Sequence, residues 1–185
     1  DTQKKTGRKL TVTFNYRYAP PRTQVKDLLL KDTIGDVLSV DFHWMLNTSH
    51  GADYYRRWHR NKRNSGGLMV HKATHHFDLV NWWIGSVPER VYASGHRRFY
   101  TPDTAKRYGL KGRAERCLDC KHIKTCPFAL DLKSGKALKS LYLDCEQHDG
   151  YYRDQCVFDA SIDIEDSMNV VVDYANDCKM TYSLN

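Results

Sequence analysis

The chain has 185 residues, a formal charge of +7, 41% hydrophobic residues and six cysteines. A chain of this length can bury roughly 70% of the surface that its unfolded form exposes, which argues against intrinsic disorder. No run approaches the roughly 20 apolar residues of a membrane-spanning helix, and the first residues lack the apolar core of a signal peptide. We therefore expect a soluble protein of one domain's size that does not contact a membrane.

The first half of the chain predicts two strands and two helices. Leu10–Tyr18 alternates in polarity and is rich in aromatic and β-branched residues, which is typical of a strand. Thr23–Lys31 has apolar residues at helical spacing, and Asp36–Leu46 alternates again with one strongly apolar face. Residues 47–67 are polar and contain several glycines, which predicts a long loop. Leu68–Trp83 then predicts a helix.

The second half predicts one more helix and four more strands. The helix covers Ala129–Leu141, after a long irregular basic region. The predicted strands alternate in polarity and cover Glu89–Phe99, Asp159–Ile164, Asn169–Tyr174 and the residues from Lys179 onward. A turn at Asn176 and Asp177 would join the last two as a hairpin. This pattern indicates an α+β fold, with an open, mainly antiparallel mixed β-sheet and helices on one face.

The positive charge raises the question of nucleic-acid binding. Its densest cluster is Arg56–Arg63, where basic residues surround Trp58 as they do in loops that contact phosphates. Charge runs of this length are usually solvated surfaces, and no helix-turn-helix, zinc-finger or RNA-recognition signature accompanies this one. We therefore expect no nucleic-acid partner.

Polar groups are concentrated on the otherwise apolar helix after Gly66-Gly67. They are His71, Lys72, His75, His76 and Asp78. On a helix several of them share one sector, so two imidazoles and a carboxylate could act on one small ligand, and imidazole exchanges protons near neutral pH. The alternatives are hydrogen-bonded core histidines with a helix salt bridge, or a zinc site, although the glutamate of H-E-x-x-H is absent. The number of such groups favours a functional site.

The cysteines suggest half of a zinc ribbon. Cys117 and Cys120 form a C-x₂-C pair, Cys126 follows, and a second pair is missing. A zinc site would therefore have to recruit Cys145 or a histidine as its fourth ligand. Free buried thiols or a disulfide are the alternatives.

Six short motifs occur in an order that resembles one enzyme family. They are Phe14-Asn-Tyr-Arg-Tyr-x-Pro20, Ile34-Gly-Asp-Val37 before a strand, Trp58 before Gly66-Gly67, His75 with Asp78-Leu79, Trp83-x-Gly85, and Pro88-x-x-Val91. With these motifs in this order, the chain resembles the substrate-binding half of members of the glucose–fructose oxidoreductase / inositol dehydrogenase (Gfo/Idh/MocA) family. Residues 100–185 match more loosely.

The resemblance implies a division of labour between two domains. Residues 1–18 would contain the last strand of a missing dinucleotide-binding domain, and residues 19–185 would be a C-terminal substrate-binding and oligomerisation domain, truncated at its end. NAD or NADP would bind to the missing domain, because the chain has no G-x-G-x-x-G phosphate cradle. The cofactor-binding residues are therefore unknown, and the chain alone would be inactive. The compartment would be the cytoplasm, or the periplasm if the missing N-terminus carries a signal.

The resemblance also implies roles for residues. His75 falls on the family's catalytic histidine, whereas His71 stands where members have an aspartate, so His71 and Lys72 are further catalytic candidates. The candidates for binding a sugar, cyclitol or related polyol are Arg17, Tyr18, Trp58, His76 and Asp78. The implied reaction is oxidation of a hydroxyl by a nicotinamide, and His75 would accept the hydroxyl proton. The alternatives are an NAD-dependent glycosidase or lyase, and a non-enzymatic zinc-knuckle or nucleic-acid-binding module.

Assembly is the last expectation. Strand alternation would place Phe42, Trp44, Val170 or Val172 on a sheet face that the helices do not cover. Two such faces packed together would bury these side chains. We therefore expect a homodimer or a higher oligomer formed through the sheet face.

Overall fold

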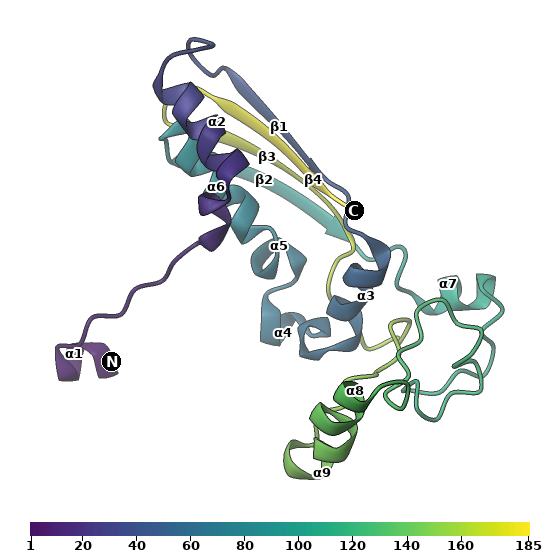
Figure 1. The fold of residues 1–185 in the computed structure, drawn as a ribbon. Helices are drawn as coiled ribbons and strands as arrows, with labels where there is room; N and C mark the ends of the chain where they lie inside the picture. The colour runs from purple at the N-terminus through teal and green to yellow at the C-terminus, as the bar shows by residue number, and fades with distance from the viewer.

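An open four-stranded sheet organises the chain, of which the computed structural model describes residues 1–185 (Figure 1). Its strands are β1 (Ser39–Trp44), β2 (Pro88–His96), β3 (Ser167–Tyr174) and β4 (Lys179–Leu184). Their order in the sheet is β1-β4-β3-β2. The β1/β4 pair is parallel, and the β4/β3 and β3/β2 pairs are antiparallel. The prediction of an open, mainly antiparallel mixed sheet is confirmed.

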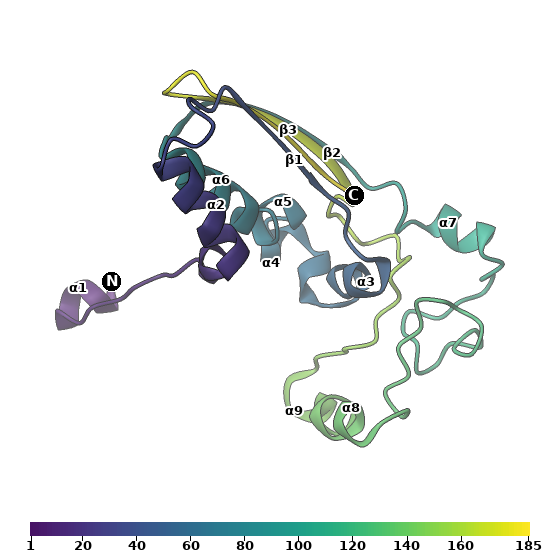
Figure 2. The same ribbon diagram turned by 45° about the horizontal axis from the view of Figure 1, so that its top comes forward.

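The helices next to the sheet all lie on one of its faces, as Figure 2 shows. They are α2 (Pro20–Leu30), α3 (Thr48–Arg56), α4 (Lys62–Ser65), α5 (Leu68–His71) and α6 (Thr74–Ile84). Short helices elsewhere are α1 (Thr2–Thr6), η1 (Asn15–Tyr18), η2 (Trp58–Arg60), α7 (Pro102–Arg107), α8 (Lys136–Leu141), η3 (Leu143–Cys145) and α9 (Glu146–Asp149). The α+β class is therefore confirmed. No helix combines the length and the apolar character that crossing a membrane requires.

The core fills the space between the inner face of the sheet and these helices. Alternate residues of β3 and β4 are buried there, as the two-residue period of a strand requires. Tyr182, in the middle of β4, is 2% exposed and contacts the rings of Phe42 and Phe77. From α3, the ring of Tyr55 stacks on that of Tyr100 with 3.8 Å between their centroids. The core thus continues from the sheet into the segment after β2.

The open face of the sheet is not lined by the residues that the sequence analysis placed there. Val170 and Val172 are buried, and Phe42 and Trp44 are half-buried against the core, so all four lie on the helix side. The prediction for these residues was wrong because alternation reveals two faces of a strand but not which face the helices cover. The open face instead carries mostly polar residues, together with Tyr92, which is 72% exposed.

Residues 97–166 form a lobe that leaves the sheet after β2 and returns at the start of β3. The residues that flank the lobe, His96 and Ser167, are cross-strand partners. Within it, the carboxylate of Asp166 is buried and accepts three backbone N–H bonds of 2.8 Å, from Arg98, Phe99 and Tyr100. One side chain therefore joins the exit of the lobe to its return.

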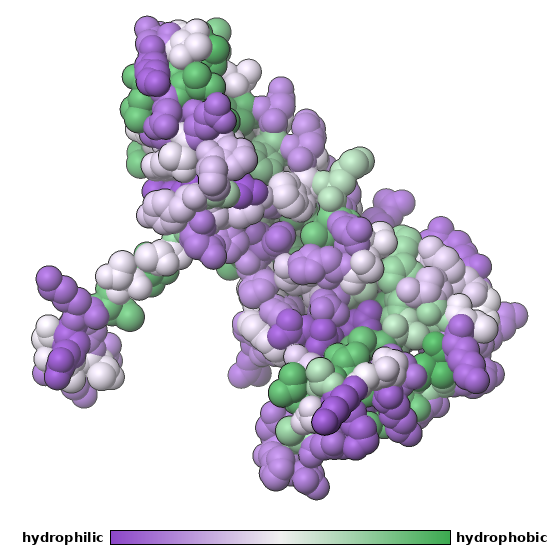
Figure 3. All heavy atoms as spheres, viewed as in Figure 1, coloured by the Kyte–Doolittle hydropathy of each residue, from purple (hydrophilic) through white to green (hydrophobic).

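Two predicted strands are absent. Residues 7–14 have no regular structure and Asn15–Tyr18 is the 3-10 helix η1, so the strand over Leu10–Tyr18 was a wrong prediction. Figure 3 shows that α1 and the extended segment after it stand clear of the rest of the molecule, where no strand can pair with them. Asp159–Ile164 does alternate between exposed and buried residues near its end, but it pairs with no strand. Alternation alone does not satisfy the backbone hydrogen bonds of a strand.

The helical predictions need three corrections. Residues 47–67, predicted as a loop, contain α3, η2 and α4. The predicted helix over Leu68–Trp83 is two helices, α5 and α6, separated at Lys72 and Ala73. Only the last part of the predicted helix over Ala129–Leu141 is helical, as α8. The predicted hairpin between β3 and β4 is confirmed, and Asp177 in its turn has a φ of 62°.

The first testable prediction concerns α6, whose Leu79 is 1% exposed. Leu79→Ala should lower the free energy of unfolding by about 2–5 kcal/mol, because it removes buried methyl groups and leaves a cavity. Urea denaturation of the chain measures this change. Leu30→Ala is the matched control, because Leu30 is also helical but 70% exposed, and its cost should stay below about 1 kcal/mol. Equal costs at both sites would contradict this packing of α6.

Candidate functional site

His75 occupies the first turn of α6, and its imidazole makes no hydrogen bond. Its Nδ1 atom is buried and has no hydrogen-bonding partner, whereas its Nε2 atom is not buried. The rings of Phe14 and Tyr16 flank it, with centroids 5.8 and 5.9 Å away. An imidazole held between aromatic rings with one accessible free nitrogen can accept a proton from a ligand.

His76, the next residue, points in a different direction and belongs to the core. It is 1% exposed, stacks on Phe42 and lies against Trp44, with centroid distances of 4.9 and 4.7 Å. Its Nδ1 is 2.9 Å from the hydroxyl of Tyr182. Burial lowers the pKa of His76 to about 4, and nearby positive charge adds to the effect. His76, predicted to bind substrate, is therefore a neutral histidine that joins α6 to the sheet.

His71, at the end of α5, lies in a second group of rings. The centroid of His59 is 4.2 Å from that of His71, and Tyr54 and Trp58 approach His71 edge-on at 5.8 and 5.7 Å. Trp58 stacks on His59 and remains 42% exposed. Burial, helped by the positive charges nearby, lowers the pKa of His71, so its neutral form is favoured at neutral pH.

Lys72 lies between the two groups of histidines, at the break between α5 and α6. Its ammonium group is 5.8 Å from the centre of the Trp44 ring. Burial lowers the pKa of Lys72, so its ammonium form loses its proton more easily than that of an exposed lysine. The structure thus places the Lys72 ammonium group beside the Trp44 ring, which packs on His76.

Arg17 and Asp78, both predicted to bind substrate, bind each other. The Nε atom of Arg17 donates to Oδ2 of Asp78 at 2.6 Å, and a second bond joins Nη2 to Oδ1. This two-point ion pair attaches η1 to α6 and thereby holds Phe14 and Tyr16 beside His75. Tyr18 is 69% exposed and lies just beyond this pair.

The predicted set of cysteine ligands is only partly brought together. Cys117, Cys120 and Cys126 line one small pocket in the lobe, and Cys156 lines it with them. Cys145 is not among the lining residues, and its Sγ donates to the carbonyl of Ser140 instead. Cys145 therefore lies outside the group of cysteines that the structure brings together. With the side chains as they stand, no three His, Cys, Asp or Glu side chains are close enough together to hold a metal ion.

Two side chains of the group around His71, Tyr54 and His59, were not predicted to belong to the site. Tyr54 was not singled out, and His59 was considered only as a metal ligand, because the pairing of both rings with His71 depends on a helix that was not predicted. A helix signal was present: the side chain of Asn47 accepts from the N–H groups of Ser49 and His50, as an N-cap residue does. It could have predicted α3, and with it the position of Tyr54.

The fold and the histidines define the class of protein: an α+β domain with an open sheet and a histidine-centred site on its helical side. The chain belongs to the Gfo/Idh/MocA oxidoreductase family, because the family model described as "Oxidoreductase family, C-terminal alpha/beta domain" matches residues 26–185. The resemblance found in the sequence is thereby confirmed.

Known proteins that are similar to this chain support its assignment to the family. YteT of Bacillus subtilis (strain 168), a protein named as an oxidoreductase, is 39% identical over 191 residues, which cover 100% of this chain and 45% of YteT. The chain thus spans less than half of this relative's length. Myo-inositol 2-dehydrogenase from Lactobacillus plantarum has a similar fold, with a TM-score of 0.55 at 13% identity over 94% of this chain and 34% of that one. Scyllo-inositol dehydrogenase from Lactobacillus casei, solved with NAD(H) and scyllo-inositol, also has a similar fold, with a TM-score of 0.54 at 13% identity. The match covers 98% of this chain and 36% of that one.

The second testable prediction concerns the pH dependence of stability. The pKa of His76 is about 4 when folded and 6.5 ordinarily, so between these values the unfolded chain binds a proton that the folded chain does not. The free energy of unfolding should therefore fall as the pH falls from 6.5 toward 4. In His76→Gln, the slope of the free energy of unfolding against pH should decrease by the equivalent of up to about one bound proton. Urea denaturation at several pH values measures this slope. An unchanged slope would show that His76 is not held neutral.

Proposed function

We propose that this chain is the substrate-binding domain of an NAD(P)-dependent oxidoreductase that acts on a hydroxyl group of a sugar, cyclitol or related polyol. The observation that carries the proposal is the free imidazole of His75, with Nε2 accessible and no hydrogen-bonding partner. Family membership and the fold shared with inositol dehydrogenases support the substrate class.

In this proposal His75 is the general base. Oxidation of a secondary alcohol removes a proton from oxygen and a hydride from carbon, and leaves a carbonyl. The nicotinamide, held by a dinucleotide-binding domain outside this chain, supplies the hydride acceptor. His75 Nε2 accepts the hydroxyl proton, so that negative charge does not build up on the substrate oxygen. Phe14, which meets the imidazole edge-on, and Tyr16, which is tilted against it, restrict its orientation.

The neighbouring groups then bind and orient the polyol. Lys72, with its lowered pKa, can hold the reacting oxygen by a hydrogen bond or share its proton with His75. Burial lowers the pKa of His71 and so favours its neutral form, which can accept a hydrogen bond from a second hydroxyl. The exposed face of Trp58 offers a flat apolar surface for the C–H groups of a sugar ring. Arg17 and Asp78, which bind each other, position this site rather than contact the substrate.

The third testable prediction uses the full-length enzyme. His75→Gln should lower kcat by roughly 10²–10⁴-fold, because proton transfer is lost, while the Kd for the nicotinamide cofactor stays nearly unchanged. Formation of the reduced nicotinamide, followed by absorbance, measures kcat. His148→Gln in α9 is the control, because His148 is exposed and lies in the lobe, and it should leave kcat unchanged.

His71→Gln distinguishes binding from proton transfer in the same assay. If His71 only binds the polyol, this variant should raise KM with little change in kcat. A kcat that survives His75→Gln would overturn the assignment of the base.

We also propose that the chain forms a homodimer through the open face of its sheet. Tyr92 of β2 and Val171 of β3 are cross-strand partners on that face, and they are 72% and 47% exposed. Beside them, Asp173 is ion-paired with both Arg90 and Lys179. On this mostly polar face, these two apolar side chains are the candidates for the buried part of an interface, and the charged residues beside them for its rim.

The fourth testable prediction follows. Light scattering should give about twice the 21.6 kDa mass of the chain at micromolar concentration. Tyr92→Glu should return the mass to that of one chain, because it places an unpaired charge in the proposed contact. Val87→Glu is the control, since Val87 is exposed but precedes β2. A single-chain mass for the unmodified protein would exclude this dimer.

A further inference from the structure

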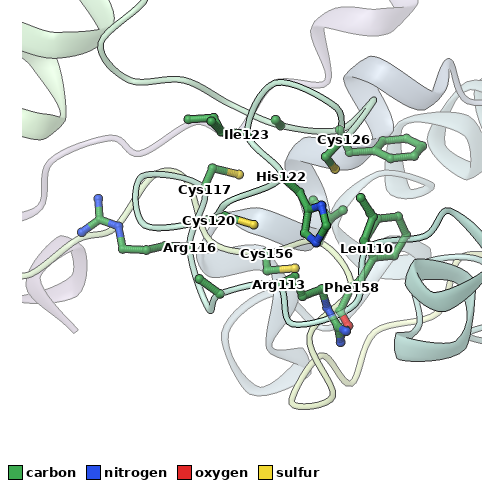
Figure 4. A pocket seen from close by; sticks show the side chains of 14 residues that line it. Leu110, Arg113, Arg116, Cys117, Cys120, His122, Ile123, Cys126, Cys156 and Phe158 are labelled. Atoms are coloured by element: carbon green, nitrogen blue, oxygen red, sulfur yellow. The ribbon is translucent and has the colours of Figure 1, made fainter.

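The lobe contains four cysteines whose arrangement the proposed reaction does not use. We propose that Cys117, Cys120, Cys126 and Cys156 form a structural zinc site. Figure 4 shows their side chains around one pocket, to which Cys156 comes from a separate segment of the chain. None of the four is in a disulfide. Tetrahedral coordination by four thiolates is characteristic of structural zinc.

The backbone brings the four residues together. The C-x₂-C segment is a tight turn in which Cys120 N–H donates to the carbonyl of Cys117 at 3.1 Å. Two more hydrogen bonds join this segment to the one that carries the fourth cysteine: Cys117 N–H donates to Asp154 O at 2.8 Å, and Cys156 N–H donates to Glu115 O at 2.7 Å. They flank the antiparallel bridge between Arg116 and Gln155, which holds Cys156 beside Cys117.

The pocket itself has the size of one ion. Its free volume is about 20 Å³, roughly that of a single water-sized sphere. This space accommodates a single ion. The N–H group of Leu130 already points at the Cys117 sulfur, at 3.4 Å, as a donor to a thiolate would. The remaining histidine of the pocket, His122, is engaged with the carbonyl of Lys111 at 2.8 Å, so the cysteines are the ligands. As no three of these side chains lie close enough together to hold an ion, binding zinc requires them to move toward one another.

A further observation is that a buried arginine, Arg56, lies close to Cys117 of this pocket. Arg56 and Arg153 are both buried and share one carboxylate, that of Asp53. The Nη1 atoms of both arginines are buried without a partner. Arg56 donates to the carbonyl of Phe128, which lines the cysteine pocket. Buried guanidinium groups need compensating charge.

A zinc ion with four thiolates would place negative charge close to the buried guanidinium group of Arg56. Each cysteine releases one proton on binding, so four thiolates and one Zn²⁺ carry a net charge of −2. With all four positions filled by protein ligands, no position remains for a substrate, which makes the site structural rather than catalytic. Its effect is to join the two halves of a lobe that has little regular secondary structure.

The fifth testable prediction separates this ligand set from the one that the sequence suggested. The chain, produced without a metal-binding tag and with zinc in the growth medium, should contain about one zinc ion by elemental analysis. Cys156→Ser should lose most of that zinc and unfold at a lower temperature. Cys145→Ser, the matched control, should keep both the zinc and the melting temperature of the unmodified chain. Loss of zinc in Cys145→Ser but not in Cys156→Ser would overturn the assignment.

A spectroscopic measurement on the unmodified chain tests the site even if Cys156→Ser does not fold. Refolding with Co²⁺ in place of zinc should give the intense visible absorption of tetrahedral cobalt bound to thiolates. Absence of zinc from the unmodified chain, together with absence of this cobalt spectrum, would overturn the proposal. Stoichiometric iron instead of zinc would overturn the identity of the metal. None of these results depends on the activity of the enzyme, so the proposed function is tested separately.

Discussion

The buried carboxylate of Asp166 is the interaction on which the arrangement of this chain depends. It accepts three N–H groups from the residues that begin the lobe, and it stands directly before β3, so it closes a segment of about seventy residues at its base. Its neighbour Glu165 extends the same junction: its Oε1 accepts from Met69 N–H at 2.9 Å, and its Oε2 is 3.2 Å from the ammonium group of Lys62. Two adjacent carboxylates thus fix the lobe and α5 to the same end of the sheet.

This junction links the two proposed sites. A Cβ at Gly67 would lie 2.5 Å from Oε1 of Glu165, and the φ of 85° there is one that residues with a side chain rarely adopt, so both features favour glycine. Gly67 begins α5, which carries His71, and the break after α5 sets the direction of His75. On the other side of the junction, the lobe holds its cysteines. The geometry of the histidines and the position of the lobe therefore depend on the same few hydrogen bonds.

The sheet could be predicted from the sequence because apolar and polar residues alternate along its strands, and the apolar ones pack into the core. β3 and β4 each bury every second residue, as their sequences indicated. Leu10–Tyr18 and Asp159–Ile164 show similar alternation but have no neighbouring strand, and a single sequence does not reveal its pairing partners. In the site, the candidates on α5 and α6 were found by their spacing. The contact of His59 with His71 and the position of Cys156 beside Cys117 were missed, because both depend on tertiary contacts between residues separated in sequence.

The pairing of His96 with Ser167 has a consequence for how such domains diversify. Strand partners of this kind lie about 5 Å apart, so a short turn could join β2 to β3 with no change in the sheet. The whole lobe is in this sense an insertion at a hairpin. Residues can be gained or lost there without altering the register of any strand, so natural variation in this part of the chain can remodel one side of the domain while its core stays the same.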